Sequence, residues 1–302
     1  MKLNNIQVLR AFAAVAVVVF HTGFAFPFMR PFGSFGVDVF FVISGYIMAR
    51  ILDPQSSSSS DFFFRRRIIR IVPPYWFFTI LLYLIAFRIP QLMGSTRASS
   101  IDLLKSLFFI PFTKGSGLIQ PLLFIGWSLN YEMFFYLALT IGLLIYKRRA
   151  IWVGAACVLA VMLACIPFAG SSTVAQFYSR DIFPFNSSRV LTLGLFSFLL
   201  VTTASLLSKG DWDALIAPLV LIGDASYILY LIHPYCEYAL DRIFAPHMHW
   251  LKRDTATGAL AGVTLSIVLA IVLHLYCERP TMRFLNRNFG GKRKSTEFAA
   301  TS

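Results

Sequence analysis

The sequence predicts an all-α fold, a polytopic bundle of transmembrane helices, and two observations support this prediction. Hydrophobic residues make up 57% of the 302 residues, while charged residues make up only 14%. A soluble domain carries about 25% charged residues, so this composition excludes an ordinary water-soluble fold. The apolar residues also gather into stretches of about 20 residues, the length that a helix needs to cross a bilayer.

Eight stretches are long and apolar enough to be membrane spans, and two ambiguous ones, 101–113 and 214–223, raise the number of membrane segments to ten at most. Most Lys and Arg residues lie at the ends of these stretches on one side, and assigning that side to the cytoplasm places both termini there. We expect a membrane domain over residues 1–285 and a basic, disordered tail over 286–302. The eight expected spans are 8–27, 36–52, 71–89, 122–146, 150–168, 182–207, 218–240 and 257–276.

The remaining composition excludes several classes of site. The formal net charge of +13 does not indicate nucleic-acid binding, because the basic residues lie at the ends of spans and the chain has no nucleic-acid-binding motif. The four cysteines lie in or beside apolar stretches without metal-ligand spacing, so we expect no metal site. The apolar N-terminus is similar to a secretory signal, but no small-residue cleavage site follows it, and we expect it to be retained.

The first apolar stretch contains two ionisable residues, Arg10 and His21. They lie eleven residues apart, about three helical turns, so they share one face and are separated by about 16 Å along the helix axis. An ionisable residue in a membrane helix faces the bundle interior or a water-filled cavity rather than lipid. We therefore expect Arg10 at the cytoplasmic mouth of a polar cavity and His21 beyond its middle. The alternatives are a snorkelling arginine and a structural, hydrogen-bonded histidine.

Two carboxylates lie in other apolar stretches. Asp38, in "FGVDVFFVISGYIM", lies near the outer end of the second span, where it could accept a hydrogen bond from His21 and leave the other imidazole nitrogen basic. A helix cap is the alternative for Asp38. Glu132, in "GWSLNYEMFFY", could be an acid, a base, an orienting group or half of a structural pair. Ser44 and Gly45 would permit close approach of two helices.

Arginines cluster in "RRRIIRIVPPYW". Arg66, Arg67 and Arg70 lie three or four residues apart, so a helix would present them as a forked cationic surface at the cytoplasmic face. Guanidinium groups bind phosphate in a bidentate manner, which suits a nucleotide-bearing donor such as coenzyme A together with Arg10. The alternative is a cluster that contacts lipid headgroups.

Several further polar and aromatic residues are candidates for lining the cavity. In "GDASYILYLIHPY" the residues Ser226, Tyr230 and His233 follow helical spacing along one stripe, although a packed hydrogen-bonded stripe is an equal alternative. His274 and Glu278 lie four residues apart and are expected to form a local pair rather than a metal site. The expected cavity-lining residues are Ser44, Trp127, Tyr131, Tyr230 and His233.

Together these motifs resemble the integral-membrane acyltransferase-three family, and most closely its exopolysaccharide O-acetyltransferases of the succinoglycan-modifying type. The resemblance covers residues 5–285 and rests on Arg10 and His21 with ten residues between them, followed in order by the four motifs quoted above. It implies transfer of an acetyl or similar acyl group from cytoplasmic acyl-CoA to a hydroxyl of an exopolysaccharide or its lipid-linked precursor. His21 would be the essential histidine and Arg10 its paired arginine, and Arg67 and Arg70, with Arg66, would match the family's arginine motif.

The resemblance also implies a multi-pass protein of a bacterial inner membrane that uses acetyl-CoA or another acyl-CoA as co-substrate and binds no permanent cofactor. The expected partners are membrane lipid, a glycan or lipid-linked acceptor and polysaccharide-assembly proteins. The chain is shorter than is usual for the family, and we expect no extracytoplasmic hydrolase-like domain.

Other functions fit the same residues. One is a transporter or flippase for a glycan lipid or an anion, although the chain shows no paired halves. Another is a peptidoglycan or lipid A acyltransferase. The residues also leave open whether His21 acts as a base or carries the acyl group as an acyl-imidazole.

Overall fold

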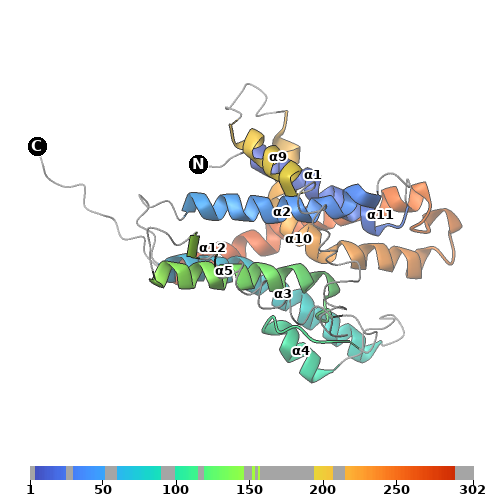
Figure 1. The fold of residues 1–302 in the computed structure, drawn as a ribbon. Coiled ribbons are helices and arrows are strands. Elements are labelled where there is room, and N and C mark those ends of the chain that lie inside the picture. The colour runs from blue at the N-terminus through green and yellow to red at the C-terminus, as the bar shows by residue number, and fades with distance from the viewer. Residues whose placement is uncertain are drawn as a thin grey trace, which may run out of the picture. The chain divides into compact units, whose positions relative to one another are not determined.

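The computed structural model describes residues 4–24, 30–51, 60–89, 99–114, 119–145, 152–153, 156, 194–206 and 215–289. These residues are helical apart from short connections and one isolated β-bridge between Thr113 and Ile119, so the all-α prediction is confirmed for them (Figure 1). The chain divides into two compact units, which are described separately below. The first is Met1–Tyr46 with Pro184–Arg279, and the second is Ile47–Phe183 with Pro280–Ser302.

Five of the described helices are long and apolar enough to cross a membrane, by length and composition. They are Asn4–His21, Phe64–Arg88, Phe124–Ile145, Ala217–Phe244 and Ala256–Phe289. They correspond to the expected spans 8–27, 71–89, 122–146, 218–240 and 257–276.

The other three expected spans have different outcomes. The span 36–52 falls in α2 (Arg30–Ile51). The span 182–207 is described only from residue 194, where its described part is the apolar helix α9 (Leu195–Leu206). The span 150–168 lies almost entirely outside the described residues. The number of eight spans and the cytoplasmic side of the termini stay predictions.

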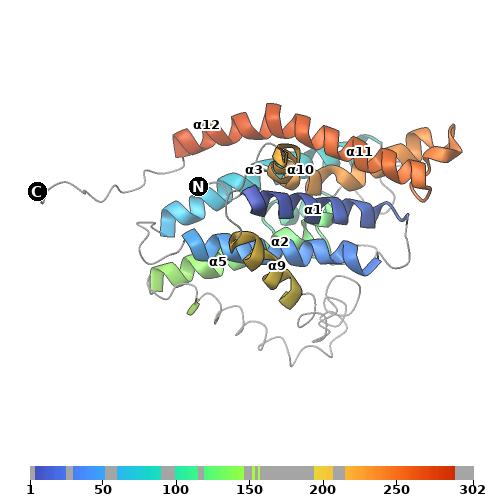
Figure 2. The ribbon, with the colours of Figure 1, turned by 90° about the horizontal axis from the view of Figure 1, so that it is seen from above.

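In the first unit, α1 (Asn4–His21) packs along α10 (Ala217–Ala239), and α10 packs against α11 (Ala256–Leu273) (Figure 2). A glycine permits the closest contact between α1 and α10, because a Cβ atom at Gly223 would overlap the backbone of Gln7. Small residues of this kind let helix backbones approach one another in membrane proteins, where van der Waals packing drives association. The contact fixes the register of α1 on α10.

Helix α2 contacts α1 through a second glycine. A Cβ atom at Gly36 would overlap the backbone oxygen of Ala13 and would lie 2.8 Å from Cγ2 of Val17. Aromatic rings extend these contacts: the ring of Phe40 in α2 lies 6.4 Å from that of Tyr230 in α10. We had expected close approach of helices at Gly45, but no atom of the described residues lies within 4 Å of a Cβ built there. Close packing of α2 on α1 therefore occurs at Gly36 rather than at the expected Gly45.

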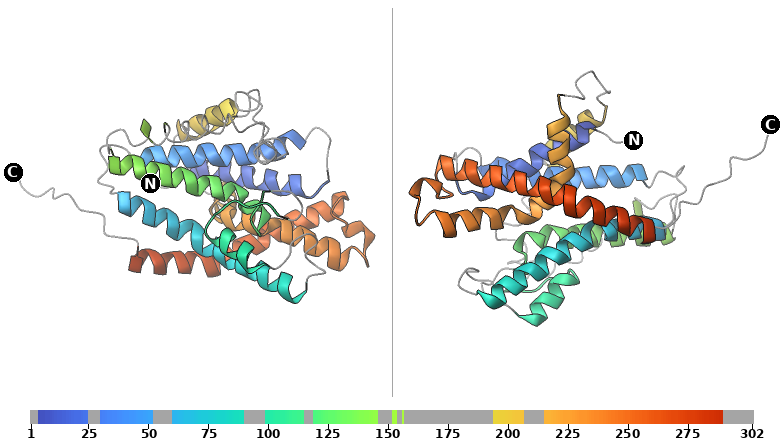
Figure 3. Two further views of the ribbon diagram at one scale, coloured as in Figure 1. Left: turned by 60° about the horizontal axis from the view of Figure 1, so that its bottom comes forward. Right: turned by 180° about the vertical axis from the view of Figure 1, so that it is seen from behind.

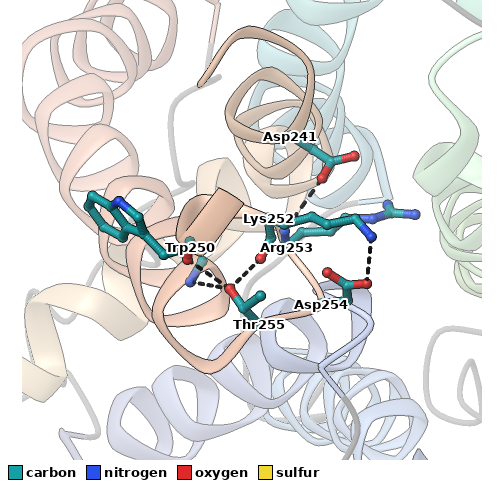
Figure 4. Close-up of polar contacts among 7 residues, drawn as sticks. Asp241, Trp250, Lys252, Arg253, Asp254 and Thr255 are labelled. Carbon is teal, nitrogen blue, oxygen red and sulfur yellow. Dashed lines mark hydrogen bonds and ion pairs between the residues drawn. The ribbon is translucent and has the colours of Figure 1, made fainter. Parts of the chain in front are cut away.

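The connection from α10 to α11 is ordered by polar contacts (Figure 4). It contains a π-helical turn, η6 (Leu240–Phe244), and a 3-10 turn, η7 (His249–Leu251). Thr255 caps α11: its hydroxyl accepts a hydrogen bond from the backbone N–H of Gly258 and donates to the carbonyl of Lys252 at 2.6 Å. Lys252 and Asp254 form an exposed ion pair at 3.1 Å. Exposed pairs of this kind are worth about 0–1 kcal/mol, so the cap is the more important contact.

In the second unit, α3 (Ser60–Arg88) packs against α4 (Ser100–Leu107) and α5 (Trp127–Ile145) (Figure 3). The buried hydroxyl of Tyr75 donates to the carbonyl of Ser106 at 3.1 Å, and Ser106 Oγ accepts from the N–H of Leu122 at 2.9 Å. A Cβ atom at Gly126 would lie 2.7 Å from the ring of Tyr75. The predicted short segment 101–113 is thus a two-turn helix and a loop held against α3.

The C-terminal helix extends further than predicted. α11 continues through a π-helical turn, η8 (His274–Glu278), into α12 (Arg279–Phe289). The expected boundary at residue 285 therefore falls inside a helix, and the remainder of the expected tail, residues 290–302, lies outside the described residues.

Candidate active site

The structure brings two histidines together in the first unit. His21 ends α1, and His233 lies in α10 with 0% of its surface exposed. Nε2 of His233 lies 3.3 Å from Nδ1 of His21, and the ring centroids are 4.9 Å apart at 62°. We had expected His233 to line a cavity, and the structure places it in direct contact with the predicted essential histidine.

Backbone carbonyls determine which nitrogen of each neutral ring carries the proton. Nδ1 of His21 lies 2.8 Å from the carbonyl oxygen of Val17. Nδ1 of His233 lies 3.1 Å from the carbonyl of Leu229 and 2.9 Å from that of Tyr230. A carbonyl oxygen can only accept a hydrogen bond, so we assign the proton to Nδ1 in both rings. Nε2 of His233 is then an acceptor, which matches its position opposite the Nδ1–H of His21.

The same assignment identifies the basic atom of the site. When Nδ1 of a neutral imidazole carries the proton, Nε2 carries the lone pair and can accept a proton or attack a carbonyl carbon. His21 is half-buried. The contacts of Nδ1 with Val17 and His233 thus set the tautomer of His21, and the expected contact of His21 with Asp38 stays a prediction.

Arg10 lies on the same stripe of α1 as His21. The buried positions of this helix include Ile6, Arg10 and Val17, spaced by four and seven residues, and His21 follows one turn later. Arg10 is only 7% exposed, and its Nη1 donates to Oε1 of Gln7 at 3.3 Å. A buried arginine in an apolar helix is costly and is found where a charged or polar partner approaches it. The shared face expected for Arg10 and His21 is consistent with this burial pattern.

Asp38 and Ser44 both lie in α2 and are half-buried. Both residues take part in further interactions. The expected role of Asp38 at His21 and that of Ser44 in lining the cavity stay predictions.

A second polar cluster lies in the second unit, between α3 and α5. Arg67 is 8% exposed, and its guanidinium carbon lies 5.7 Å from the ring centroid of Tyr136. The hydroxyl of Tyr136 donates to Oε1 of Glu132. Arg67 is also within electrostatic range of Glu132 and of Arg70. The chain therefore places the predicted Glu132 beside the predicted arginines, in a cluster that compensates a buried guanidinium.

The three predicted arginines differ in exposure. Arg66 is exposed, Arg70 is half-buried and Arg67 is buried. Of the three, Arg66 and Arg70 are therefore at least partly accessible, whereas the guanidinium of Arg67 packs against Tyr136. The cationic surface expected from the sequence thus consists of Arg66 and Arg70, because Arg67 is buried.

The other predicted residues have clear neighbours. The ring of Trp127 lies 6.2 Å from that of Tyr131 in a T-shaped arrangement on α5. The ring of Tyr230 lies 6.0 Å from that of His233. His274 Nδ1 and Glu278 Oε2 are 2.5 Å apart within η8, so the expected local pair is confirmed.

Sequence reasoning missed two acidic groups in the first unit, of which Glu237 is buried and Asp224 is half-buried. Glu237 is 2% exposed and lies one turn after His233 on α10, and its Oε1 has no hydrogen-bond partner among the described residues. Asp224 accepts a hydrogen bond from Arg279 at 3.4 Å. Both lie inside or at the end of the expected span 218–240, where any carboxylate is a candidate for function. Both carboxylates could therefore have been singled out from the sequence alone, by their position within an expected membrane span.

Membrane-length apolar helices and ionisable groups buried among them define a helical membrane protein. A family model described as an acyltransferase domain matches residues 3–185, more than half of the chain, so the protein belongs to this acyltransferase family, as the sequence motifs had predicted. It is also similar to the exopolysaccharide production protein ExoZ of Rhizobium meliloti (strain 1021), with 29% identity over 296 residues that cover 83% of this chain and 90% of the relative. No solved structure matches the chain.

Proposed function

We propose that the protein transfers an acyl group, such as acetyl, from acyl-CoA to a carbohydrate hydroxyl of an exopolysaccharide or its lipid-linked precursor. Membership of the acyltransferase family and similarity to an exopolysaccharide production protein support this proposal. The observation that carries it is the His21 ring, whose Nδ1 faces the Val17 carbonyl and whose Nε2 is therefore the basic nitrogen. A neutral imidazole held in one tautomer is suited to acyl transfer.

In the direct route, Nε2 of His21 takes the proton of the acceptor hydroxyl while the hydroxyl oxygen attacks the thioester carbonyl carbon. The carbon–sulfur bond then breaks, and the leaving thiolate receives the proton from Nε2. In the two-step route, Nε2 attacks the thioester carbon, the carbon–sulfur bond breaks and coenzyme A leaves as the thiolate, so that His21 carries the acyl group as an acyl-imidazole. The acceptor hydroxyl oxygen then attacks the acyl carbon, the carbon–nitrogen bond breaks, and the hydroxyl proton neutralises the thiolate. Both routes use the same ring orientation.

The arginine cluster is assigned to the donor. Guanidinium groups bind phosphate in a bidentate, charge-assisted manner, and coenzyme A carries several phosphates. Arg66 and Arg70 are accessible for this contact. Arg67 supports them from beneath, with Tyr136 stacked on it and Glu132 compensating its charge. In this proposal Glu132 acts on the donor side, and the expected role of Arg10 in donor binding stays a prediction.

Oriented membrane vesicles test the proposed reaction. We further propose that the acyl group is transferred at the face opposite the cytoplasm, because His21 is expected beyond the middle of the membrane. Radiolabelled acetyl-CoA supplied only at the cytoplasmic face should then label the carbohydrate acceptor at the opposite face. Vesicles from cells that lack the protein are the control and should show no labelling. Labelling confined to the cytoplasmic face would contradict transfer across the membrane. Absence of labelling from any acyl-CoA would contradict the donor assignment.

A further inference from the structure

We propose that His233 is a positioning residue for the reaction, which accepts the Nδ1–H of His21 and stabilises the positive charge that His21 gains during acyl transfer. This inference rests on the proposed function, because it assigns a role to the second ring of the histidine pair. The contact that carries it is the 3.3 Å separation between Nε2 of His233 and Nδ1 of His21.

The local sequence explains how the His233 ring is held. In an α-helix each carbonyl accepts from the N–H four residues later, but residue 234 is a proline and has no N–H. The carbonyl of Tyr230 therefore lacks its helical donor, and Nδ1 of His233 approaches it at 2.9 Å. The same nitrogen lies 3.1 Å from the carbonyl of Leu229. The dipeptide His233–Pro234 thus fixes the proton on Nδ1 and turns Nε2 toward α1.

The partner ring is held in a matching way. The Nδ1–H of His21 is shared between the carbonyl of Val17, at 2.8 Å, and Nε2 of His233. The ring of Phe20 lies edge-on to His21 at 5.2 Å, and the ring of Tyr230 lies beside His233. These apolar ring faces lower the local dielectric constant, which strengthens a hydrogen bond to a charged group.

The acceptor matters most when His21 is charged. In the direct route the acceptor hydroxyl gives its proton to Nε2 and its oxygen bonds to the thioester carbon, so His21 carries protons on both nitrogens until the thiolate takes one. During that interval the Nδ1–H bears part of the positive charge and donates more strongly to Nε2 of His233. A buried carboxylate has this orienting role in serine protease triads. Here the neutral imidazole of His233 would have this orienting role.

The test compares substitutions that keep or remove an acceptor at the position of Nε2. The amide of His233→Gln reaches as far as Nε2 of the ring, whereas that of His233→Asn reaches only as far as Nδ1, and His233→Leu has no acceptor. A hydrogen bond to a charged group is worth enough to change a rate by about 10- to 100-fold. We expect kcat of the purified protein with acetyl-CoA to fall by about this factor in His233→Leu and His233→Asn, with an unchanged KM for the donor. His233→Gln should recover most of the loss.

The outcomes separate this role from a packing role and from failure of the proposed function. His249→Gln is the control, because His249 is an exposed histidine in η7 outside the pair, and it should behave as the unchanged protein. Gel filtration and thermal unfolding in detergent identify folded variants.

If His233→Leu does not fold, the comparison of His233→Gln with His233→Asn decides, since both carry an amide. Equal activity of the Gln and Asn variants overturns the proposal, as does full activity of a folded His233→Leu protein. Full activity of His21→Ala would instead overturn the proposed function.

Discussion

Replacement of His21 by alanine should abolish O-acylation of the cell's surface polysaccharide while its export continues. The substitution removes the imidazole whose Nε2 is made basic by the contact of Nδ1 with Val17. General acid–base catalysis contributes about 10²–10⁴-fold to a rate, and a covalent route through the same ring would lose more. Mass spectrometry of polysaccharide from a deletion strain carrying either form of the gene measures the acyl content directly.

The same strains distinguish an enzyme from a transporter. In a flippase or anion transporter, buried Arg and His residues would line a permeation path, and loss of His21 would reduce the amount of exported polysaccharide rather than its acylation. His247→Ala is a matched control, because His247 is an exposed histidine on the connection from α10 to α11. Normal acylation in the His21→Ala strain would contradict the catalytic assignment, and loss of export would favour transport.

Replacement of Gly36 by alanine should destabilise the protein and lower its activity. The added Cβ atom would overlap the backbone oxygen of Ala13, which cannot rotate away, and would crowd Val17. Overpacking of a well-packed core costs about 1–3 kcal/mol. Because the carbonyl of Val17 also holds Nδ1 of His21, displacement of this turn should disturb the reactive ring as well as the helix contact. The thermal unfolding midpoint in detergent and the transfer rate measure the two effects.

Gly45→Ala provides the control on the same helix. Nothing in the described part of the chain lies within 4 Å of a Cβ at Gly45, so the added methyl group meets no described neighbour. Alanine is also the better helix former by about 1 kcal/mol. We therefore expect unchanged or slightly raised stability. Equal destabilisation at both glycines would show that close contact with α1 is not the reason for glycine at position 36.

The sequence predicted the fold class and the main membrane helices well, because both depend on local composition. A stretch of about 20 apolar residues identifies a membrane helix wherever it packs. The helix ends were less predictable. α11 runs through the π-helical turn η8 into α12, because helical geometry continues past the last apolar residue. Residues 279–289 are amphipathic, so a search for continuous apolar stretches misses them, although their helical periodicity can be read from the sequence.

The candidate site was predicted in part. His21 and Arg10 could be singled out because an ionisable residue in an apolar stretch is costly and needs a reason. The contact between His21 and His233 could not be predicted, because the two residues are 212 positions apart in the sequence and their contact depends on how α1 packs on α10. Asp38 was chosen because it lies near the outer end of the second span, on the side of His21, and its role at His21 stays a prediction.

The glycines and the acidic residues show the same limit. Gly36 and Gly45 are indistinguishable in sequence, and only the position of α1 decides which one is crowded. Glu132 was expected to be a catalytic or orienting residue; its contacts with Tyr136 and Arg67 link it to the arginine cluster, and its expected role at His21 stays a prediction. The sequence thus indicates that such a residue is a candidate, and its contacts in the folded protein are needed to assign its role.

Nitrogen-15 NMR of the protein in bilayers tests the central claim most directly, which is that the fold fixes the His21 ring with its proton on Nδ1. The chain has five histidines, so substitution of each in turn assigns the ring signals. At a pH where His21 is neutral, we predict that its Nδ1 carries the proton and its Nε2 the lone pair. Observation of the opposite tautomer, with the proton on Nε2, would contradict the account, because the nitrogen assigned to attack or accept a proton would then have no lone pair to use.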